Sequence, residues 1–275
     1  MKDLFKVYKQ PKLQNPSLIL SWSEDIAQLG PAVIDLMNKK LGGEKFADIE
    51  PSDFFAMGGV AIKNDLIHFP ESEFYACENN NLVLFRSDAP GNEWYRFLNL
   101  VLEIAENCCG VKEIYTIGGM ASLIAHTNPR RIWTVVNQPE LKGMLTGYGL
   151  YNEMNYRTPS GGRPTLSSYL LWIAKRRNIS GMNLWQEIPF YLAQTTDPNA
   201  CKAMIEFLGK KLNFAIDLEE LNQHIEKQEG TINQFRLENP QIDECLSKLE
   251  RTEELTHEEN EKLAKEINDL LSKER

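Results

Sequence analysis

A loop rich in glycine and arginine is the first candidate for binding chemistry. It runs from Tyr156 to Pro164 and directly precedes a helix predicted from Thr165 onward. Backbone N–H groups at a helix N-terminus bind anions, and glycine lets a carboxylate or phosphate approach the backbone closely. An ordinary turn is the favoured alternative, and without a Lys-Ser/Thr ending the loop is no triphosphate site. The candidate anion ligands are Arg157, Thr158, Ser160, Gly161, Gly162 and Arg163.

A second candidate is a crevice at the ends of buried strands. The pair Gly118-Gly119 follows an apolar run, and in open α/β sheets ligands bind beyond the carboxyl ends of the strands. Glycines also suit a tight turn that binds nothing. Asp88 and Glu187 could form an acid–base pair, because carboxylates that meet only in the fold leave no local motif. The possible crevice residues are Ser87, Asp88, Gly118, Gly119, His126 and Glu187.

The residue types that make recognisable catalytic or metal sites are scattered. The sequence has no GxSxG, HExxH or CxxC motif, and its five cysteines and four histidines are not clustered at ligand spacing. We therefore expect free thiols, no catalytic residues, no metal and no cofactor.

Composition indicates an ordinary globular protein. The chain has 275 residues, 42% of them hydrophobic and 25% charged, with a net charge of −9. Nonspecific nucleic-acid binding depends on Lys and Arg, so a nucleic-acid partner is disfavoured. No stretch approaches the roughly 18 apolar residues of a membrane helix, and Met1–Lys6 does not open a signal peptide. We expect a cytoplasmic protein that does not enter a membrane.

Alternating apolar runs and amphipathic helices should position the candidate residues. Asn79-Asn80-Asn81 separates two apolar runs and predicts a hairpin. The alternation favours an α/β fold with a largely parallel, mixed sheet covered by helices on both faces. The predicted strands lie near residues 17–22, 66–69, 73–77, 82–85, 114–117, 131–136 and 182–185. The predicted helices lie near residues 31–41, 94–108, 166–176 and 198–212.

The C-terminal fifth of the chain is acidic and helical in pattern. Residues 222–275 contain fourteen acidic and eight basic residues, so they hold −6 of the net charge of −9. Asn239-Pro240 should separate two helices, and Thr256 to Glu259 is a capping box that should begin a third. We expect an α/β domain over 1–221 and a helical extension over 222–275. The extension should fold back as helices on the domain or on each other, and contribute to partner contacts.

An ordered set of segments resembles the proteasome assembly chaperone 2 family over about Ser17–Leu221. The segments are Trp94–Phe97, Ile114–Met120, Pro159–Gly161, Leu184–Leu192, Asp197–Ala200 and Leu208–Leu218. The resemblance implies a three-layer α/β/α sandwich like that of the phosphorylase/nucleosidase fold, frequent homo-oligomers and no established catalytic residues. In eukaryotic and archaeal relatives it also implies a role in assembling or binding the proteasome.

Two departures from the family pattern limit what the resemblance implies. Thr158 stands where the family loop Gly-Pro-x-Gly has its first glycine. The chain ends in Lys273-Glu274-Arg275, whereas archaeal relatives that dock on the proteasome end in a hydrophobic-Tyr-any tripeptide. We therefore expect no insertion of this terminus into a proteasome pocket.

Two functional classes follow from the sequence. The favoured one is a non-catalytic protein-interaction or assembly factor, with a protein partner or self-association as a homo-oligomer. The alternative is an enzyme or a small-molecule sensor that uses the phosphorylase-like crevice. Catalysis would require Arg157, Arg163, Asp88, Glu187 and His126 to converge in one cleft.

Overall fold

The computed structural model describes residues 4–55 and 60–273, which divide into two compact units. The first unit holds Ile34–Ile117, Trp133–Leu184 and the N-terminal residues up to Glu24. The second holds Asp25–Val33, Gly118–Ile132 and the residues from Trp185 onward. The domain boundary expected near residue 221 stays a prediction.

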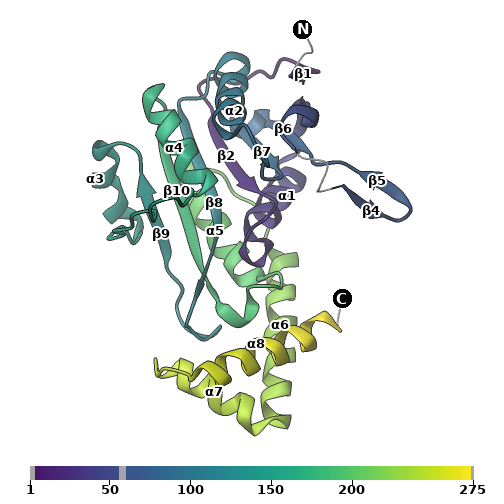
Figure 1. The fold of residues 1–275 in the computed structure, drawn as a ribbon, viewed down its shortest axis with the longest axis vertical. Helices are drawn as coiled ribbons and strands as arrows, with labels where there is room; N and C mark the ends of the chain where they lie inside the picture. Colours follow the sequence, from purple (N-terminus) through teal and green to yellow (C-terminus); the bar gives the residue numbers. More distant parts are fainter. Residues whose placement is uncertain (1–3, 56–59, 274–275) are drawn as a thin grey trace. The chain divides into compact units, whose positions relative to one another are not determined.

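Strands alternate with helices over much of the chain, except for a run of five strands between residues 44 and 87 (Figure 1). The strands are β1 (Phe5–Val7), β2 (Ser17–Trp22), β3 (Glu44–Ile49), β4 (Ala61–Lys63), β5 (Leu66–His68), β6 (Ser72–Cys77), β7 (Leu82–Ser87), β8 (Glu113–Ser122), β9 (Ile132–Val136) and β10 (Ser180–Pro189). The α-helices are α1 (Leu29–Leu41), α2 (Trp94–Cys109), α3 (Lys142–Leu145), α4 (Leu166–Arg176), α5 (Pro198–Leu212), α6 (Glu219–Glu238), α7 (Pro240–Glu250) and α8 (His257–Ser272). Short 3-10 helices are η1 (Ile26–Gln28), η2 (Pro51–Asp53), η3 (Glu78–Asn80), η4 (Pro139–Leu141), η5 (Thr146–Tyr148) and η6 (Phe190–Leu192). Over the described residues, none of the helices has the length and apolar character that crossing a bilayer requires.

Eight strands form one mixed sheet in the order β1-β3-β6-β7-β2-β8-β10-β9, while β4 and β5 form a separate two-stranded sheet. The expected α/β fold with a large sheet and helices is confirmed. The expected parallel pairing is found for β2 with β7 and with β8, but β1, β3, β6 and β7 pair antiparallel in succession. The predicted hairpin at the three asparagines joins β6 to β7, with Asn81 at φ +54°. A connection this short can join only antiparallel strands.

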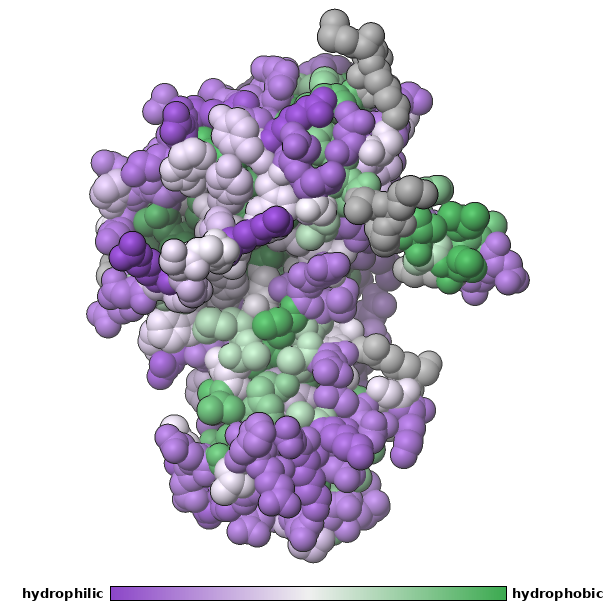
Figure 2. All heavy atoms as spheres, viewed as in Figure 1, coloured by the Kyte–Doolittle hydropathy of each residue, from purple (hydrophilic) through white to green (hydrophobic). Residues whose placement is uncertain are grey.

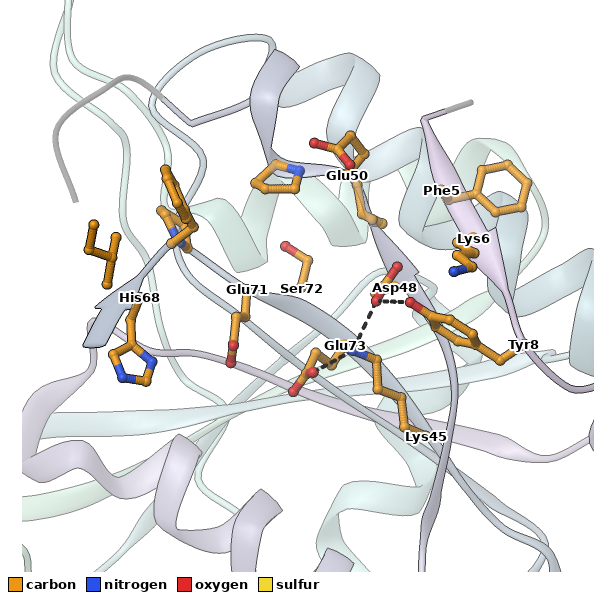
Figure 3. Close-up of a pocket in the computed structure, with 15 residues that line it drawn as sticks. Phe5, Lys6, Tyr8, Lys45, Asp48, Glu50, His68, Glu71, Ser72 and Glu73 are labelled. Atoms are coloured by element: carbon orange, nitrogen blue, oxygen red, sulfur yellow. Dashed lines mark hydrogen bonds and ion pairs between the residues drawn. The ribbon is translucent and has the colours of Figure 1, made fainter. Parts of the chain in front are cut away.

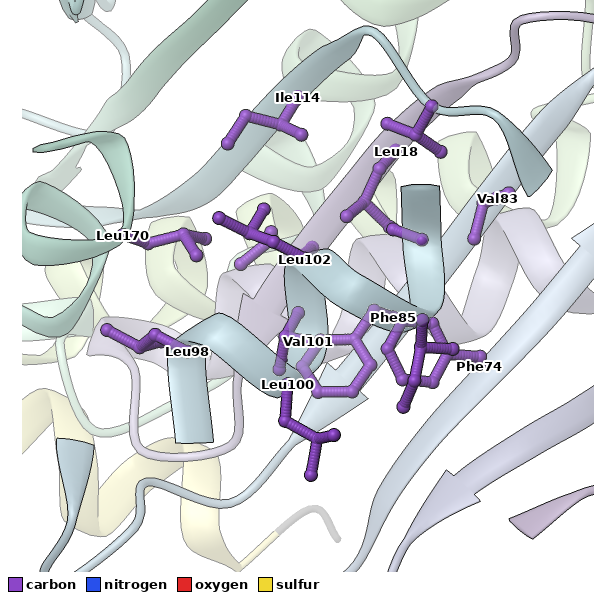
Figure 4. Close-up of a cluster of buried hydrophobic side chains, with 14 of the residues drawn as sticks. Leu18, Phe74, Val83, Phe85, Leu98, Leu100, Val101, Leu102, Ile114 and Leu170 are labelled. Carbon is purple, nitrogen blue, oxygen red and sulfur yellow. The ribbon is translucent and has the colours of Figure 1, made fainter. Parts of the chain in front are cut away.

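The core of the first unit lies between the sheet and helices α2 and α4 (Figure 4). Leu18 of β2 and Phe85 of β7 meet Val101 of α2 and Leu170 of α4 in this core, and all four side chains are fully buried. The rings of Phe74 and Phe85 are 4.4 Å apart between centroids. Each fully buried side chain of this kind stabilises the fold by about 1.5–3 kcal/mol. This packing holds α2 and α4 against one face of the sheet.

Helix α1 lies on the opposite face of the sheet from α2. Side chains alternate along a strand, so Arg86 points away from the core that holds Phe85. The Arg86 guanidinium donates to the Asp35 carboxylate of α1 at 2.9 Å. This partly exposed ion pair shows that the residues of α1 that belong to the first unit lie beside β7.

The C-terminal helices α6, α7 and α8 pack within the second unit. Helix α8 contacts η6, and α6 contacts α5, with Leu263 and Ile267 of α8 fully buried. Helix α7 begins at Pro240, and α8 has the capping box of Thr256 and Glu259, so the expected break and cap are confirmed. The C-terminal tripeptide that differs from the archaeal docking motif includes residues 274 and 275. These two residues lie outside the described residues.

Candidate functional site

The predicted anion-binding loop is an exposed turn in the first unit. Gly162 donates its backbone N–H to the Pro159 carbonyl at 2.9 Å, and Gly161 lies at φ +81°. A glycine at this position is what a type II turn requires. The N-terminus of α4 is already capped, because the Thr165 hydroxyl accepts from the Ser168 N–H at 3.1 Å. The glycines serve the turn, and anion binding there stays a prediction.

The other candidates of this loop lie at the protein surface. Arg157 and Ser160 are exposed, and Thr158 is partly buried. The Arg163 guanidinium lies 5.7 Å from the centroid of the Trp94 ring, within cation–π distance. The loop therefore contributes positive charge beside the start of α2.

Ser87 and Asp88, the first two crevice candidates, close the end of the β6–β7 pair in the first unit. The buried Ser87 hydroxyl lies 2.7 Å from the Ser72 hydroxyl and donates to the Asp88 carbonyl. The Asp88 carboxylate accepts from the Glu71 N–H at 2.9 Å. Both side chains thus have structural hydrogen bonds at the turn.

Gly118 and Gly119 lie in β8 and adjoin Asp25 in the second unit. The sequence predicted a strand that ends at these glycines, but β8 continues to Ser122. The Gly119 N–H donates to Asp25 Oδ1 at 2.9 Å, and the Gly30 N–H donates to Oδ2 at 2.7 Å. Burial raises the pKa of Asp25, although these hydrogen bonds favour its charged form. Asp25 was not among the predicted site residues, and its signal in the sequence was its place just beyond the carboxyl end of β2.

His126 and Glu187, also in the second unit, have separate partners. His126 pairs with Tyr191 through its backbone N–H and its Nδ1 atom, and burial lowers its pKa to about 4. The Glu187 carboxylate accepts from the Arg131 N–H at 3.0 Å, and the Glu187 N–H donates to the Arg131 carbonyl at 3.0 Å. Whether the crevice candidates together bind a ligand stays a prediction.

The cysteines are free, as predicted. Burial raises the pKa of Cys77 to about 11 and that of Cys201 to about 12, so neither is a reactive thiolate at neutral pH. Within residues 4–55 and 60–273, no group of three or more His, Cys, Asp or Glu side chains could hold a metal ion.

A cavity of about 760 Å³ lies in the first unit, and none of the predicted site residues lines it (Figure 3). A row of charged side chains crosses it from β3 to β6. Lys45 contacts the carboxylates of Asp48 at 2.8 Å and Glu73 at 2.6 Å, and the Tyr8 hydroxyl donates to Asp48 at 2.7 Å. The missed signal was the recurrence of charged residues along Glu44–Ile49 and Ser72–Cys77.

The charged groups of this cavity stabilise one another. Partial burial opposes the charge on Lys45, but its hydrogen bonds to Asp48 and Glu73 prevail and raise its pKa above the usual range. Burial likewise opposes the charge on Glu73, and hydrogen bonds from Lys45 and Tyr75 lower its pKa. Both groups therefore stay charged at neutral pH, as a set of structural ion pairs does.

An aromatic face is exposed on α2 and α4 in the first unit. Its members are Tyr95, Tyr169, Trp172 and Arg176, and we refer to these four residues as the aromatic face. The Tyr95 and Tyr169 rings are 6.4 Å apart, the Tyr169 and Trp172 rings 5.6 Å apart, and the Arg176 guanidinium lies 4.9 Å from the Trp172 ring. Tyr95 is 53% exposed and Trp172 47% exposed. The signal in the sequence was the i, i+3, i+7 spacing of Tyr169, Trp172 and Arg176, because this spacing places the three residues on one side of a helix.

Comparisons with known proteins agree with this fold. Residues 19–236 match the model of the PAC2 family. An uncharacterized protein of Methanocaldococcus jannaschii is 27% identical over 239 residues, covering 84% of this chain and 87% of that protein. The crystal structure of Pyrococcus furiosus PbaB, an archaeal proteasome activator, is similar with a TM-score of 0.68 at 21% identity, covering 84% of this chain and 98% of that one. The Mycobacterium tuberculosis proteasome-assembly chaperone homologue gives a TM-score of 0.71 at 15% identity, covering 84% and 99% of the two chains.

Proposed function

Because the chain belongs to the PAC2 family, we propose that it is a non-catalytic assembly factor that works by protein–protein contact. Two proteins of similar fold are described as a proteasome activator and as a proteasome-assembly chaperone homologue. We accordingly propose the proteasome or one of its subunits as the client. Self-association, a cytoplasmic location and a three-layer phosphorylase/nucleosidase type of sandwich belong to the same proposal.

The aromatic face is the observation that carries the proposal. Tyr, Trp and Arg are the residues most enriched among those that dominate protein–protein binding energies. In the aromatic face the Tyr169 and Trp172 rings contact each other at a tilt and Arg176 lies over Trp172, so little side-chain freedom is lost when a partner covers them. A partner that buries Trp172 would remove about half of its surface from water.

The charges around the aromatic face favour an acidic client surface. Among the described residues, Arg163, Lys175 and Arg176 have no carboxylate within ion-pair distance. In a chain of net charge −9, these cations make a local positive field. Complementary charge accelerates encounter and excludes partners of the same sign.

The enzymatic alternative receives less support from the cavity. A general acid or base is most effective when its pKa lies near the working pH. The pKa of Lys45 is raised and that of Glu73 is lowered, so the shifts move both groups away from neutrality. The cavity's charges are arranged to remain paired, which favours the interaction role.

The experiment is a binding titration of the full chain against the purified proteasome core particle of the native organism and its isolated subunits. We expect wild-type protein to bind, and Trp172→Ala to weaken binding by at least tenfold, as central aromatic truncations commonly do. Leu123→Ala is a matched control, because Leu123 is an apolar residue that is 61% exposed and lies outside both the aromatic face and the C-terminal extension. It should bind like the wild type.

Affinity purification from the native organism would test the same surface without a chosen client. Proteins captured by the wild type but not by Trp172→Ala would be identified by mass spectrometry. If no proteasome component binds the wild type, and Trp172→Ala captures the same set of proteins, the proposed function is wrong.

A further inference from the structure

A β-hairpin stands apart from the large sheet of the first unit (Figure 1). Strands β4 and β5 pair antiparallel, with Ile62 opposite Ile67. Asn64 at φ +50° and Asp65 at φ +62° join them. Positive φ at both central residues is the signature of a type I′ turn, whose twist matches that of a hairpin.

One face of this hairpin is apolar. Ile62 and Ile67 share a face because they are directly paired. Val60 directly precedes β4 and Phe69 directly follows β5, and the alternation of side chains, continued by one residue beyond each strand, adds both to the same face. The four side chains are 42% (Val60), 75% (Ile62), 65% (Ile67) and 62% (Phe69) exposed. We call these four residues the hairpin face, and Figure 2 shows the apolar surface gathered over β4 and β5.

The hairpin face exposes a large apolar surface for a hairpin that has little stability of its own. Isolated two-stranded hairpins are at best marginally stable, and β4 and β5 have three residues each. Four large apolar side chains, each about half to three-quarters exposed, present on the order of 400 Å² of apolar surface, a size that commonly marks an interaction site. The hairpin therefore gains stability if another surface covers this face.

We propose that the hairpin face packs against the same face of a second copy of this chain. This inference rests on the self-association included in the proposed function and specifies its surface. A contact of one patch with itself must be self-complementary. The hairpin face meets this requirement because its four side chains carry no charge and no hydrogen-bonding group. Two such two-stranded sheets can pack face to face as sheets do in a sandwich.

Area and charge both favour a second copy over an acidic client at this surface. Two hairpin faces would together bury on the order of 800 Å² of apolar side chain, and their backbone and polar borders bring the total toward the roughly 1,200 Å² of small stable interfaces. Ile67 and Phe69 also line the cavity, and its polar groups, including Lys6 and Glu71, supply such a border. A contact made through the uncharged hairpin face also places no like charges of the two copies, each of net charge −9, directly opposite one another.

The test is the mass of the full chain in solution, measured by light scattering coupled to size-exclusion chromatography. We expect the wild type to have an even multiple of the 31.5 kDa chain mass. Ile67→Lys and Ile67→Glu should each halve that mass, because each places a charge at the centre of the hairpin face. A mixture of the two variants should regain the wild-type mass, because opposite charges would then meet across the contact.

Controls separate loss of the contact from loss of the fold. Leu123→Lys places the same charge at an apolar residue that is 61% exposed and lies outside both the hairpin face and the C-terminal extension, and it should leave the mass unchanged. The Ile67 variants should keep the wild-type circular dichroism and client binding. A monomeric wild type at tens of micromolar, or Ile67 variants of unchanged mass, would overturn the inference. If those variants lost client binding instead, the hairpin would be the client surface. If the Ile67 variants all still bind the client, the proposed function stands whatever their mass.

Discussion

The Tyr191 hydroxyl contacts His126 at two points, accepting from its backbone N–H at 2.6 Å and lying 2.8 Å from its Nδ1 atom. Both residues are buried in the second unit, His126 being 4% exposed. Because the hydroxyl already accepts from the backbone, its own hydrogen is free to point at Nδ1. A neutral imidazole suits this arrangement, because Nδ1 can accept the hydroxyl hydrogen and Nε2 has no hydrogen-bond partner among the described residues to stabilise a second proton.

The first prediction is a pH dependence of stability that originates at His126. Burial, followed by the positive charges of Arg130 and Arg236, lowers the pKa of His126 to about 4. The unfolded chain then binds a proton near pH 6.5 that the folded chain does not bind until about pH 4. His126 therefore leaves the free energy of unfolding at its full value above pH 6.5. As the pH falls toward 4, the free energy of unfolding decreases by roughly 3 kcal/mol in total.

Urea unfolding at a series of pH values between 7.5 and 4.5 measures this effect. His126→Gln removes the titrating group, so the free energy of unfolding of this variant should fall less steeply with acid than that of the wild type, by close to one proton. Equal slopes for the two proteins would show that the pH dependence arises at other groups.

A second prediction concerns the hydroxyl of Tyr191 itself. Tyr191→Phe leaves the backbone N–H of His126 without its buried acceptor, and unmet buried groups of this kind cost about 1–3 kcal/mol. Tyr169→Phe is the matched control, since Tyr169 is a partly exposed member of the aromatic face. In chemical denaturation, the midpoint of Tyr191→Phe should lie at a lower denaturant concentration than that of this control. Equal midpoints would contradict the role given to the hydroxyl.

A third prediction tests the close approach of backbone at Gly119. A Cβ atom at this position would lie 2.6 Å from the Ile26 carbonyl oxygen and 3.1 Å from the Ile26 Cβ. Gly119→Ala should therefore destabilise the protein by about 1–3 kcal/mol through overpacking. Gly230 in α6 has open space around it, so Gly230→Ala should stabilise the protein by about 1 kcal/mol through helix propensity. Thermal unfolding of both variants would show opposite shifts, and a neutral Gly119→Ala would refute the contact.

Local pattern predicted most elements of the fold because their signals are local. The helix at residues 166–176 and the helix beginning at Pro198 have caps and apolar periodicity within their own sequences. Strand β3 was missed because Glu44 and Lys45 hide its pattern, and its place between β1 and β6 depends on partners distant in sequence. The antiparallel pairing of β1, β3, β6 and β7 likewise depends on which strands become neighbours in the sheet, and no local pattern specifies those neighbours.

The sites were harder to predict than the elements because they are built across strands and helices. The contact of Lys45 with Glu73 needs the register of β3 against β6, which no local pattern contains. Tyr95 joins Trp172 in the aromatic face only because α2 and α4 lie side by side. The glycine loop was visible in sequence, yet its φ and hydrogen bond explain its composition without a ligand.

The last prediction concerns the C-terminal helices, whose stability should come mainly from packing of their apolar faces. Leu263 of α8 is fully buried, and α8 contacts η6, α6 and α7 within the second unit. Leu263→Ala should therefore leave a cavity and lower the free energy of unfolding by about 2–5 kcal/mol. Leu237→Ala removes the same atoms from a leucine that is 82% exposed, and its effect should stay within about 0.5 kcal/mol. Urea unfolding followed by circular dichroism compares the two variants. A Leu263→Ala protein as stable as Leu237→Ala would mean that α8 contributes nothing to the second unit, and its buried stripe would then need another explanation.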